Sequence, residues 1–174
     1  MKGFLKEVFS WIQIIVIAAL IAFLLNNFVI ANSRVPSASM ENTIMTGSRL
    51  IGSRLHYNFT DPKRGDIIIF RYPDDESIFF VKRIIGIGGD TIDIIDGKVF
   101  LNGTSTPLDE PYIKEAMIPE ESVHYEVPEG AYFCLGDNRN NSGDSRRWKN
   151  TFVYRNKIIA KVLFQYFPSI KKIS

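Results

Sequence analysis

Residues 64–101 read RGDIIIFRYPDDESIFFVKRIIGIGGDTIDIIDGKVFL, and this stretch decides the fold class. Short runs rich in isoleucine, valine and phenylalanine alternate with turn residues, and no part keeps the 3.6-residue repeat of a helix. Asp96-Gly97 lies between two such runs and predicts a two-residue hairpin, because both central residues of a type I′ turn need positive φ. We therefore predict strands over 66–72, 78–87, 91–95 and 98–101.

Runs of the same kind continue on both sides of this stretch, without any internal repeat. Asn102-Gly103 is a second turn signal of the hairpin kind. Residues 104–128 carry four prolines and little apolar alternation, which indicates an excursion from the main sheets. The predicted fold class is mainly β, with antiparallel sheets over residues 34–174 and with residues 91–130 as a small inserted subdomain or long excursion. The remaining predicted strands are 49–51, 124–127, 131–135 and 157–166.

An uncharged segment precedes this β-rich domain. Residues 8–33 contain no charged side chain, although Glu7 and Arg34 flank them directly. As a helix, the segment would extend about 39 Å, which is enough to cross a hydrocarbon core of about 30 Å. Trp11 lies where an aromatic interfacial anchor is expected. We predict that residues 8–33 form a single transmembrane anchor.

The charges beside the anchor favour one orientation. Lys2 and Lys6 favour a cytoplasmic N-terminus over residues 1–7, although Glu7 weakens this signal. Residues 34–174 would then form an extracytoplasmic domain. The anchor would be the only membrane pass of the chain.

Two other interpretations of the apolar segment were weighed. Residues 29–31 end in Ala31 and resemble a cleavage site, so the segment could be a cleavable signal peptide with Ala31 as its cleavage point. The apolar region is longer than the 7–15 residues typical of such signals, which favours a retained anchor. A buried core helix is disfavoured, because no second apolar segment could surround it.

Charge and composition exclude several classes of partner. Once Lys2, Lys6 and Glu7 are set aside from the 21 basic and 19 acidic residues, the rest of the chain is nearly neutral, and nothing predicts a nucleic-acid partner. The single cysteine, Cys134, excludes an internal disulfide and is expected to be a buried apolar residue. Two histidines far apart do not form a metal motif, so no metal or cofactor is predicted.

The first candidate for chemistry is a pair of serines close behind the anchor. Ser37 and Ser39 lie in the string Pro-Ser-Ala-Ser-Met over residues 36–40, where the anchor would hold them near the outer membrane surface. Serines in such a loop are usually part of a solvated linker. The string therefore needs support from elsewhere in the chain.

That support comes from a lysine inside an apolar strand. Period-2 alternation places Phe80, Lys82 and Ile84 on one face of the predicted strand 78–87. Burial disfavours the charged form of an amine and lowers its pKa, which makes a lysine usable as a general base. The alternative is that Lys82 lies on an exposed strand face, where a lysine protects a sheet edge.

A third block covers residues 136–146 and reads GDNRNNSGDSR. It is dense in turn formers, hydroxyls and charges, as surface loops often are. Asp137, Asn138 and Asp144 offer hard oxygen ligands for a cation, but their spacing does not match a calcium-binding EF-hand loop. The block could instead position Lys82 through hydrogen bonds.

These blocks, in this order behind one N-terminal anchor, closely resemble the bacterial type I signal peptidases of the single-anchor kind, a Ser-Lys family of serine proteases. Residues 64–70 and 89–90 are similar to further motifs of the family. The resemblance implies a serine endopeptidase of the bacterial cell membrane that uses no cofactor. It would remove N-terminal signal peptides from secretory preproteins after a small residue, through an acyl-enzyme, in contact with membrane lipid.

The resemblance also assigns roles to residues. Ser39 would be the nucleophile and Lys82 the general base, and Ser37 would form the oxyanion hole with the backbone N–H of Ser39. Ser142 would orient the lysine amine. Supporting ion pairs would be Asp137 with Arg83 and Asp144 with Arg146. Substrate pockets would be lined by Val35, Pro36, Met40, Ile69, Phe80 and Val81.

Three positions depart from the family pattern. Asn42 and Gly88 stand where proline is usual, and Ala38 stands where glycine is common. No catalytic group is lost. Proline would have fixed φ at the first two positions, so we expect extra freedom of the backbone there and an altered pocket shape.

Three other classes of protein fit the sequence less well. Self-cleaving transcriptional repressors share the Ser-Lys arrangement, but this chain has an anchor and no DNA-reading helix. The eukaryotic-type signal peptidases have histidine at the position of Lys82. An anchored β-domain that binds exported proteins without cutting them is the non-enzymatic alternative, and it requires Ser39 or Lys82 to be mispositioned.

Overall fold

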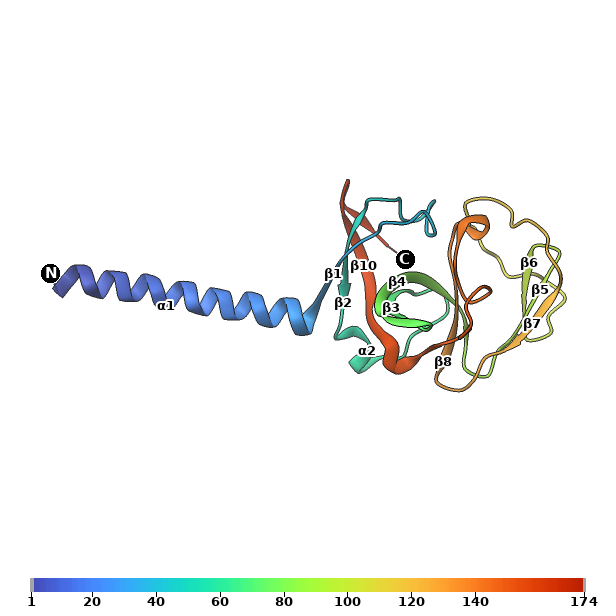
Figure 1. Cartoon of the computed structure of the whole chain (residues 1–174), viewed down its shortest axis with the longest axis horizontal. Coiled ribbons are helices and arrows are strands. Elements are labelled where there is room, and N and C mark those ends of the chain that lie inside the picture. Colours follow the sequence, from blue (N-terminus) through green and yellow to red (C-terminus); the bar gives the residue numbers. More distant parts are fainter. Residues whose placement is uncertain (1, 174) are drawn as a thin grey trace.

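The computed structural model describes residues 2–173. Met1, the first residue of the predicted segment 1–7, and Ser174, the last residue of the predicted segment 34–174, lie outside the described residues. Helix α1 (Lys2–Leu24) projects from the rest of the molecule as an isolated rod (Figure 1). It continues as a π-helical segment, η1 (Leu25–Val29), which passes directly into strand β1 (Ile30–Arg34). The helical part therefore ends before residue 33, the predicted end of the anchor, because residues 30–33 pair with a neighbouring strand.

One apolar segment of the described chain could cross a membrane. Lys6–Val29 is long and apolar enough by composition, with a mean hydropathy of 2.7, and no part of it is buried against the domain. From Ile14 to Leu24 every residue of this helix is apolar, so this half has no polar face to turn toward water. This agrees with a membrane anchor.

The domain is built on an eight-stranded antiparallel sheet. Its strands follow the order β1-β2-β10-β3-β4-β8-β9, with β11 paired to β10. Three short helical segments connect them: α2 (His56–Phe59), η2 (Arg139–Asn141) and η3 (Arg155–Lys157). The strands after β1 are β2 (Arg49–Ser53), β3 (Ile67–Tyr72), β4 (Asp75–Ile87), β8 (Ala131–Leu135), β9 (Val153–Tyr154), β10 (Ile158–Phe167) and β11 (Lys171–Lys172).

A second, three-stranded sheet lies at the end of the molecule opposite α1 (Figure 1). It consists of β5 (Thr91–Ile95), β6 (Lys98–Leu101) and β7 (Val123–Glu126), in the order β6-β5-β7. The β5–β6 turn has φ of 52° at Asp96 and 72° at Gly97, as the hairpin signal predicted. Ile92 of this sheet and Phe133 of β8 belong to one apolar cluster, so the two sheets share part of their core.

The predicted fold class, mainly antiparallel β behind one apolar helix, is confirmed. Every predicted strand is present, with ends that differ by at most a few residues. Strands β1, β9 and β11 were not predicted, because β1 lies at the end of the apolar segment and the other two have only two residues each. Cys134 is fully buried in β8, as predicted.

Strand β4 is only partly covered by its neighbours, and this leaves an open sheet edge. On one side it pairs with β3 along most of its length, from Asp75 to Arg83. On the other side its pairing with β8 begins only at Arg83. The preceding residues of β4, which include Lys82, therefore have no strand partner on that side within residues 2–173.

Candidate active site

Ser39 lies in a tight turn between β1 and β2, called here the serine turn (residues 37–44). The N–H of Glu41 donates to the carbonyl of Ala38 at 3.1 Å, and the N–H of Ile44 donates to the carbonyl of Met40 at 2.8 Å. Met40 and Ile44 are fully buried and fix the turn to the core below it. Ser39 is held against the protein and is only 7% exposed.

Lys82 reaches Ser39 from the partly uncovered segment of β4. Its Nζ donates a hydrogen bond of 2.5 Å to Ser39 Oγ, and Ser37 Oγ lies 3.3 Å from Ser39 Oγ. Lys82 is 3% exposed, and its Nζ lies 5.4 Å from the centre of the Phe80 ring. The alternative of an exposed strand lysine is therefore wrong, because on the predicted apolar face Lys82 and Ile84 are buried and Phe80 is half-buried.

The surroundings of Lys82 change its protonation. Burial is the main cause and lowers the pKa of Lys82 to about 8, with Asp144, Cys134 and Asp137 opposing the change. Lysine ordinarily titrates near 10.4. An amine with a pKa of about 8 is largely neutral in mildly alkaline solution, and a neutral amine can accept a proton.

The loop over residues 136–146, called here the GDN loop, holds the serine turn from the side. The backbone N–H of Asn138 donates to the carbonyl of Ser39 at 3.1 Å, and its side-chain Nδ2 donates to the carbonyl of Ala38 at 3.0 Å. Gly136 packs so closely that a Cβ there would lie 2.4 Å from the Ser39 carbonyl oxygen. The sequence predicts Asn138 only as a candidate cation ligand; its contacts with the serine turn depend on tertiary packing across about 100 residues and leave no local sequence signal.

Two buried ion pairs fix the ends of the GDN loop. Arg83, next to Lys82 on β4, makes two hydrogen bonds to Asp137, at 2.9 and 2.8 Å, and Asp137 also accepts one from Thr43 of the serine turn. Arg146 Nε donates to Asp144 at 2.8 Å, and Asp144 in turn accepts the N–H of Gly136 at 3.1 Å. Both pairs suggested by the family resemblance are thus formed.

A groove of about 320 Å³ runs beside Ser39 and Lys82. One wall is the chain from Ser33 to Ser39, and the other is the open segment of β4 from Ile78 to Lys82. Four of the residues suggested as substrate-binding line the groove: Val35, Pro36, Phe80 and Val81. Met40 and Ile69 do not line it, because both are packed in the apolar core beneath the serine turn.

Ser142 differs from the role that the resemblance suggested. Its Oγ is buried and has no hydrogen-bond partner among residues 2–173, so its orientation of the Lys82 amine stays a prediction. The Oγ does lie close to the site, since it and the Ser39 carbonyl oxygen would both contact a Cβ placed on Gly136. Among the described residues, no three His, Cys, Asp or Glu side chains are grouped so that they could hold a metal ion.

The pKa of Lys82 predicts a pH dependence for any reaction that uses this amine as base. Because protonation removes the base, kcat/KM for a peptide substrate should fall about tenfold per pH unit below a pKa of about 8 and level off above it. The measurement is kcat/KM between about pH 5 and pH 10, with circular dichroism to show that the fold persists. A flat profile across pH 8 would contradict the neutral-amine base.

Comparisons with family models, with known proteins and with solved structures give consistent matches. The family model described as "Signal peptidase, peptidase S26" matches residues 8–167. The probable signal peptidase I-1 of Synechocystis sp. is 37% identical over 91% of this chain and 82% of its own length, and the signal peptidase I of Bacillus licheniformis is 33% identical over 94% and 90%. A crystal structure of a signal peptidase I from Enterococcus faecalis superposes with a TM-score of 0.50 at 30% identity, over 59% of this chain and 97% of that one.

Proposed function

The chain belongs to the signal peptidase family, peptidase S26, and from this premise we propose that Ser39 and Lys82 form its catalytic dyad and cut secretory preproteins after a small residue. The protein is a membrane-anchored serine endopeptidase that removes signal peptides from preproteins. The observation that carries the dyad is the buried 2.5 Å hydrogen bond between Lys82 Nζ and Ser39 Oγ.

The proposed reaction follows from this contact. Neutral Lys82 takes the proton of Ser39 Oγ as the oxygen attacks the substrate carbonyl carbon, and negative charge develops on the carbonyl oxygen. The Ser37 hydroxyl and the Ser39 backbone N–H would donate hydrogen bonds to that oxygen. Lys82 then gives its proton to the leaving amine, which breaks the peptide bond and leaves an acyl-enzyme. Lys82 then takes a proton from a water that attacks the ester carbonyl carbon. As the bond to Ser39 Oγ breaks and the new carboxyl end leaves, Lys82 gives that proton to Ser39 Oγ.

The groove suggests how a preprotein binds. The uncovered edge of β4 offers backbone groups to an extended peptide, which would lie as an added strand between β4 and the chain at residues 33–37. Val35, Pro36 and Val81 give this groove a shallow apolar lining beside Ser39. Such a lining fits small residues next to the cut, as in an Ala-x-Ala site, and gives a long side chain little depth.

The sheet register supports a site close to the anchor. One row of paired residues crosses the sheet from the end of the helix to the proposed base, through Ile30, Ser53, Lys161, Ile68 and Lys82. Lys82 thus lies level with the end of the helix along the strand direction. The proposal puts the N-terminus in the cytoplasm, the helix across a bacterial cell membrane, and the catalytic domain on the outer side, beside the lipid.

The test of this function is direct cleavage. The full-length chain in detergent should cut a secretory preprotein once, and sequencing of the new N-terminus should place the cut directly after a small residue. Ser39→Ala is the matched control, because it removes only the attacking oxygen, and it should give no product. Cleavage by Ser39→Ala at the rate of the parent chain would contradict the dyad.

Two further measurements separate cutting from mere binding. A serine-reactive probe should label the parent chain at Ser39, whereas a non-catalytic binding domain would not react. A substrate N-methylated on its backbone near the cut should be cleaved more slowly, because an added strand would lose a hydrogen bond to β4. Equal rates for the methylated and unmethylated substrates would argue against strand addition.

A further inference from the structure

We propose that residues 110–120 of the inserted excursion form a positioning strap, which holds the serine turn and the GDN loop in the geometry that the Ser39–Lys82 pair needs. The inference rests on the proposed dyad and adds Asn42 as a positioning residue. The segment has no regular secondary structure between β6 and β7. It nevertheless contacts both the serine turn and the GDN loop along its length.

The first contacts are with the serine turn. Asn42 has a φ of 87°, a left-handed conformation that asparagine tolerates and proline cannot adopt. In this conformation its side-chain Nδ2 donates to the carbonyls of Tyr112 and Ile113, at 3.0 and 3.3 Å. Next to it, Glu41 forms an ion pair of 2.9 Å with Lys114. The strap thus binds the turn two and three residues after Ser39.

The same part of the strap binds the GDN loop. The N–H of Lys114 donates to the carbonyl of Asp137 at 2.9 Å. Asn140 Nδ2 donates to the carbonyl of Ala116 at 3.0 Å, and its Oδ1 accepts the N–H of Ile118 at 2.8 Å. Lys114 therefore links both loops, through its side chain to one and its backbone to the other.

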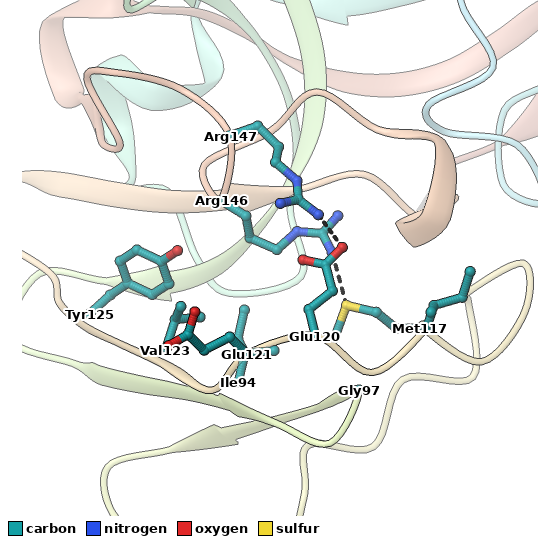
Figure 2. Close-up of a pocket in the computed structure, with 10 residues that line it drawn as sticks. Ile94, Gly97, Met117, Glu120, Glu121, Val123, Tyr125, Arg146 and Arg147 are labelled. Atoms are coloured by element: carbon teal, nitrogen blue, oxygen red, sulfur yellow. Dashed lines mark hydrogen bonds and ion pairs between the residues drawn. The ribbon is translucent and has the colours of Figure 1, made fainter.

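Figure 2 shows the far end of the strap, where it lines a small cavity of about 50 Å³ against the end of the GDN loop. Arg146 Nη1 donates to the sulfur of Met117 at 2.9 Å, and Arg147 pairs with Glu120. Arg146 is also the partner of Asp144, which accepts the N–H of Gly136. The strap thus reaches Gly136, which packs against Ser39, through two intermediate side chains.

These contacts matter because the reaction depends on distances. Misplacement of a reacting group by about 1 Å can cost a factor of roughly 10² in rate. Within the described part of the chain, the groove walls at residues 33–39 and 78–82 make no hydrogen bond to the strap, so weakening the strap should leave substrate binding largely intact. A weakened strap should therefore lower kcat and leave KM nearly unchanged.

The experiment compares Asn42→Gly with Asn102→Gly in the full-length chain. Both asparagines have positive φ, 87° and 52°, and each side chain makes two hydrogen bonds. Asn102 Nδ2 donates to Asp90, and Asn102 Oδ1 accepts from the N–H of Thr91. Glycine keeps the backbone conformation and removes the bonds. We expect Asn42→Gly to lose roughly tenfold or more in kcat with KM changed less than about twofold. Asn102→Gly should lower Tm by about as much as Asn42→Gly does, but its kcat should stay within about twofold of that of the parent chain.

Hydrogen exchange supplies a readout that does not depend on cleavage. In Asn42→Gly, but not in Asn102→Gly, the N–H groups of Ile44 and Asn138 should exchange faster, because both are hydrogen-bonded within or to the serine turn. Equal exchange of these N–H groups in the two variants would overturn the strap proposal. Faster exchange in Asn42→Gly with an unchanged kcat would also overturn it. If the parent chain does not cut preproteins while the exchange difference is present, the proposed function fails and the strap's hold on the turn stands.

Discussion

A Lys82→Met variant should keep its fold and should cleave a preprotein roughly 10⁴-fold more slowly than the parent chain, because it has no base to take the Ser39 proton. Methionine has a similar volume and fills the same apolar space beside Phe80. It also removes the cost of burying an amine that is 3% exposed. We therefore expect Tm to be unchanged or higher. The measurements are kcat/KM at about pH 8 and a thermal melt in detergent.

A Ser37→Ala variant should lose less activity than Lys82→Met and serves as its comparison. It removes one of the two proposed oxyanion donors and leaves Ser39 and Lys82 in contact, so the expected loss in kcat is smaller, roughly 10²- to 10³-fold. Lys82→Met with more than a tenth of the parental rate would exclude Lys82 as the base. A Ser37→Ala variant as slow as Lys82→Met would instead show that Ser37 supports the dyad itself.

Gly136→Ala is expected to cost both stability and activity, although it adds a single methyl group. The new Cβ would lie 2.3 Å from Ser142 Oγ and 2.4 Å from the Ser39 carbonyl oxygen, so the serine turn and the GDN loop must separate. Overpacking of this kind typically costs about 1–3 kcal/mol. The displacement of Ser39 from Lys82 should lower kcat by roughly 10²-fold.

Gly143→Ala in the same loop is the control for stability. Its Cβ would meet no atom within 4 Å, so the Tm of this variant should match that of the parent chain. Denaturant or thermal unfolding measures the stability of each variant, and kcat in a preprotein assay measures the loss of activity of Gly136→Ala. A Gly136→Ala variant with parental Tm and kcat would mean that the two loops are not in close contact in solution.

The fold was predictable because its main signals are local. Alternation and the Asp96-Gly97 turn determine where strands begin and end, and period 2 alone placed Lys82 beside Phe80. The boundary at β1 was not predictable in this way, because Ile30 and Ala31 are as apolar as the helix before them. Their strand conformation depends on pairing with β2, which lies about 20 residues later in the chain.

The site was predicted less completely than the fold. Met40 and Ile69 are apolar residues near the site, and sequence does not distinguish a groove wall from the core behind it. Both lie in the core. The position of Ser142 Oγ, which has no hydrogen-bond partner among residues 2–173, likewise depends on tertiary packing. The strap could not be predicted at all, since it has no periodicity and its contacts with the serine turn join residues about 70 positions apart.

Asn42 and Gly88, the two positions where the family usually has proline, are constrained in different ways. Extra backbone freedom was expected at Asn42 and Gly88. Asn42 instead has a defined left-handed conformation with two side-chain hydrogen bonds. At Gly88 a Cβ would lie 3.0 Å from the Cα of Glu129 and 3.1 Å from the N of Gly130, so this position is crowded by backbone. Neither position is an open, unconstrained part of the loop.

The direct junction of η1 with β1 also determines how the enzyme meets its substrate. No linker separates the helix from the first strand of the domain, so the anchor would hold the domain close to the membrane. In the proposed topology, a preprotein held in the same bilayer by its own apolar segment would diffuse in the same plane, and the two would meet by a two-dimensional search. Confinement of this kind gives an effective concentration far above the bulk value. A groove with weak intrinsic affinity is then sufficient, and discrimination can rest on the few residues beside the cut.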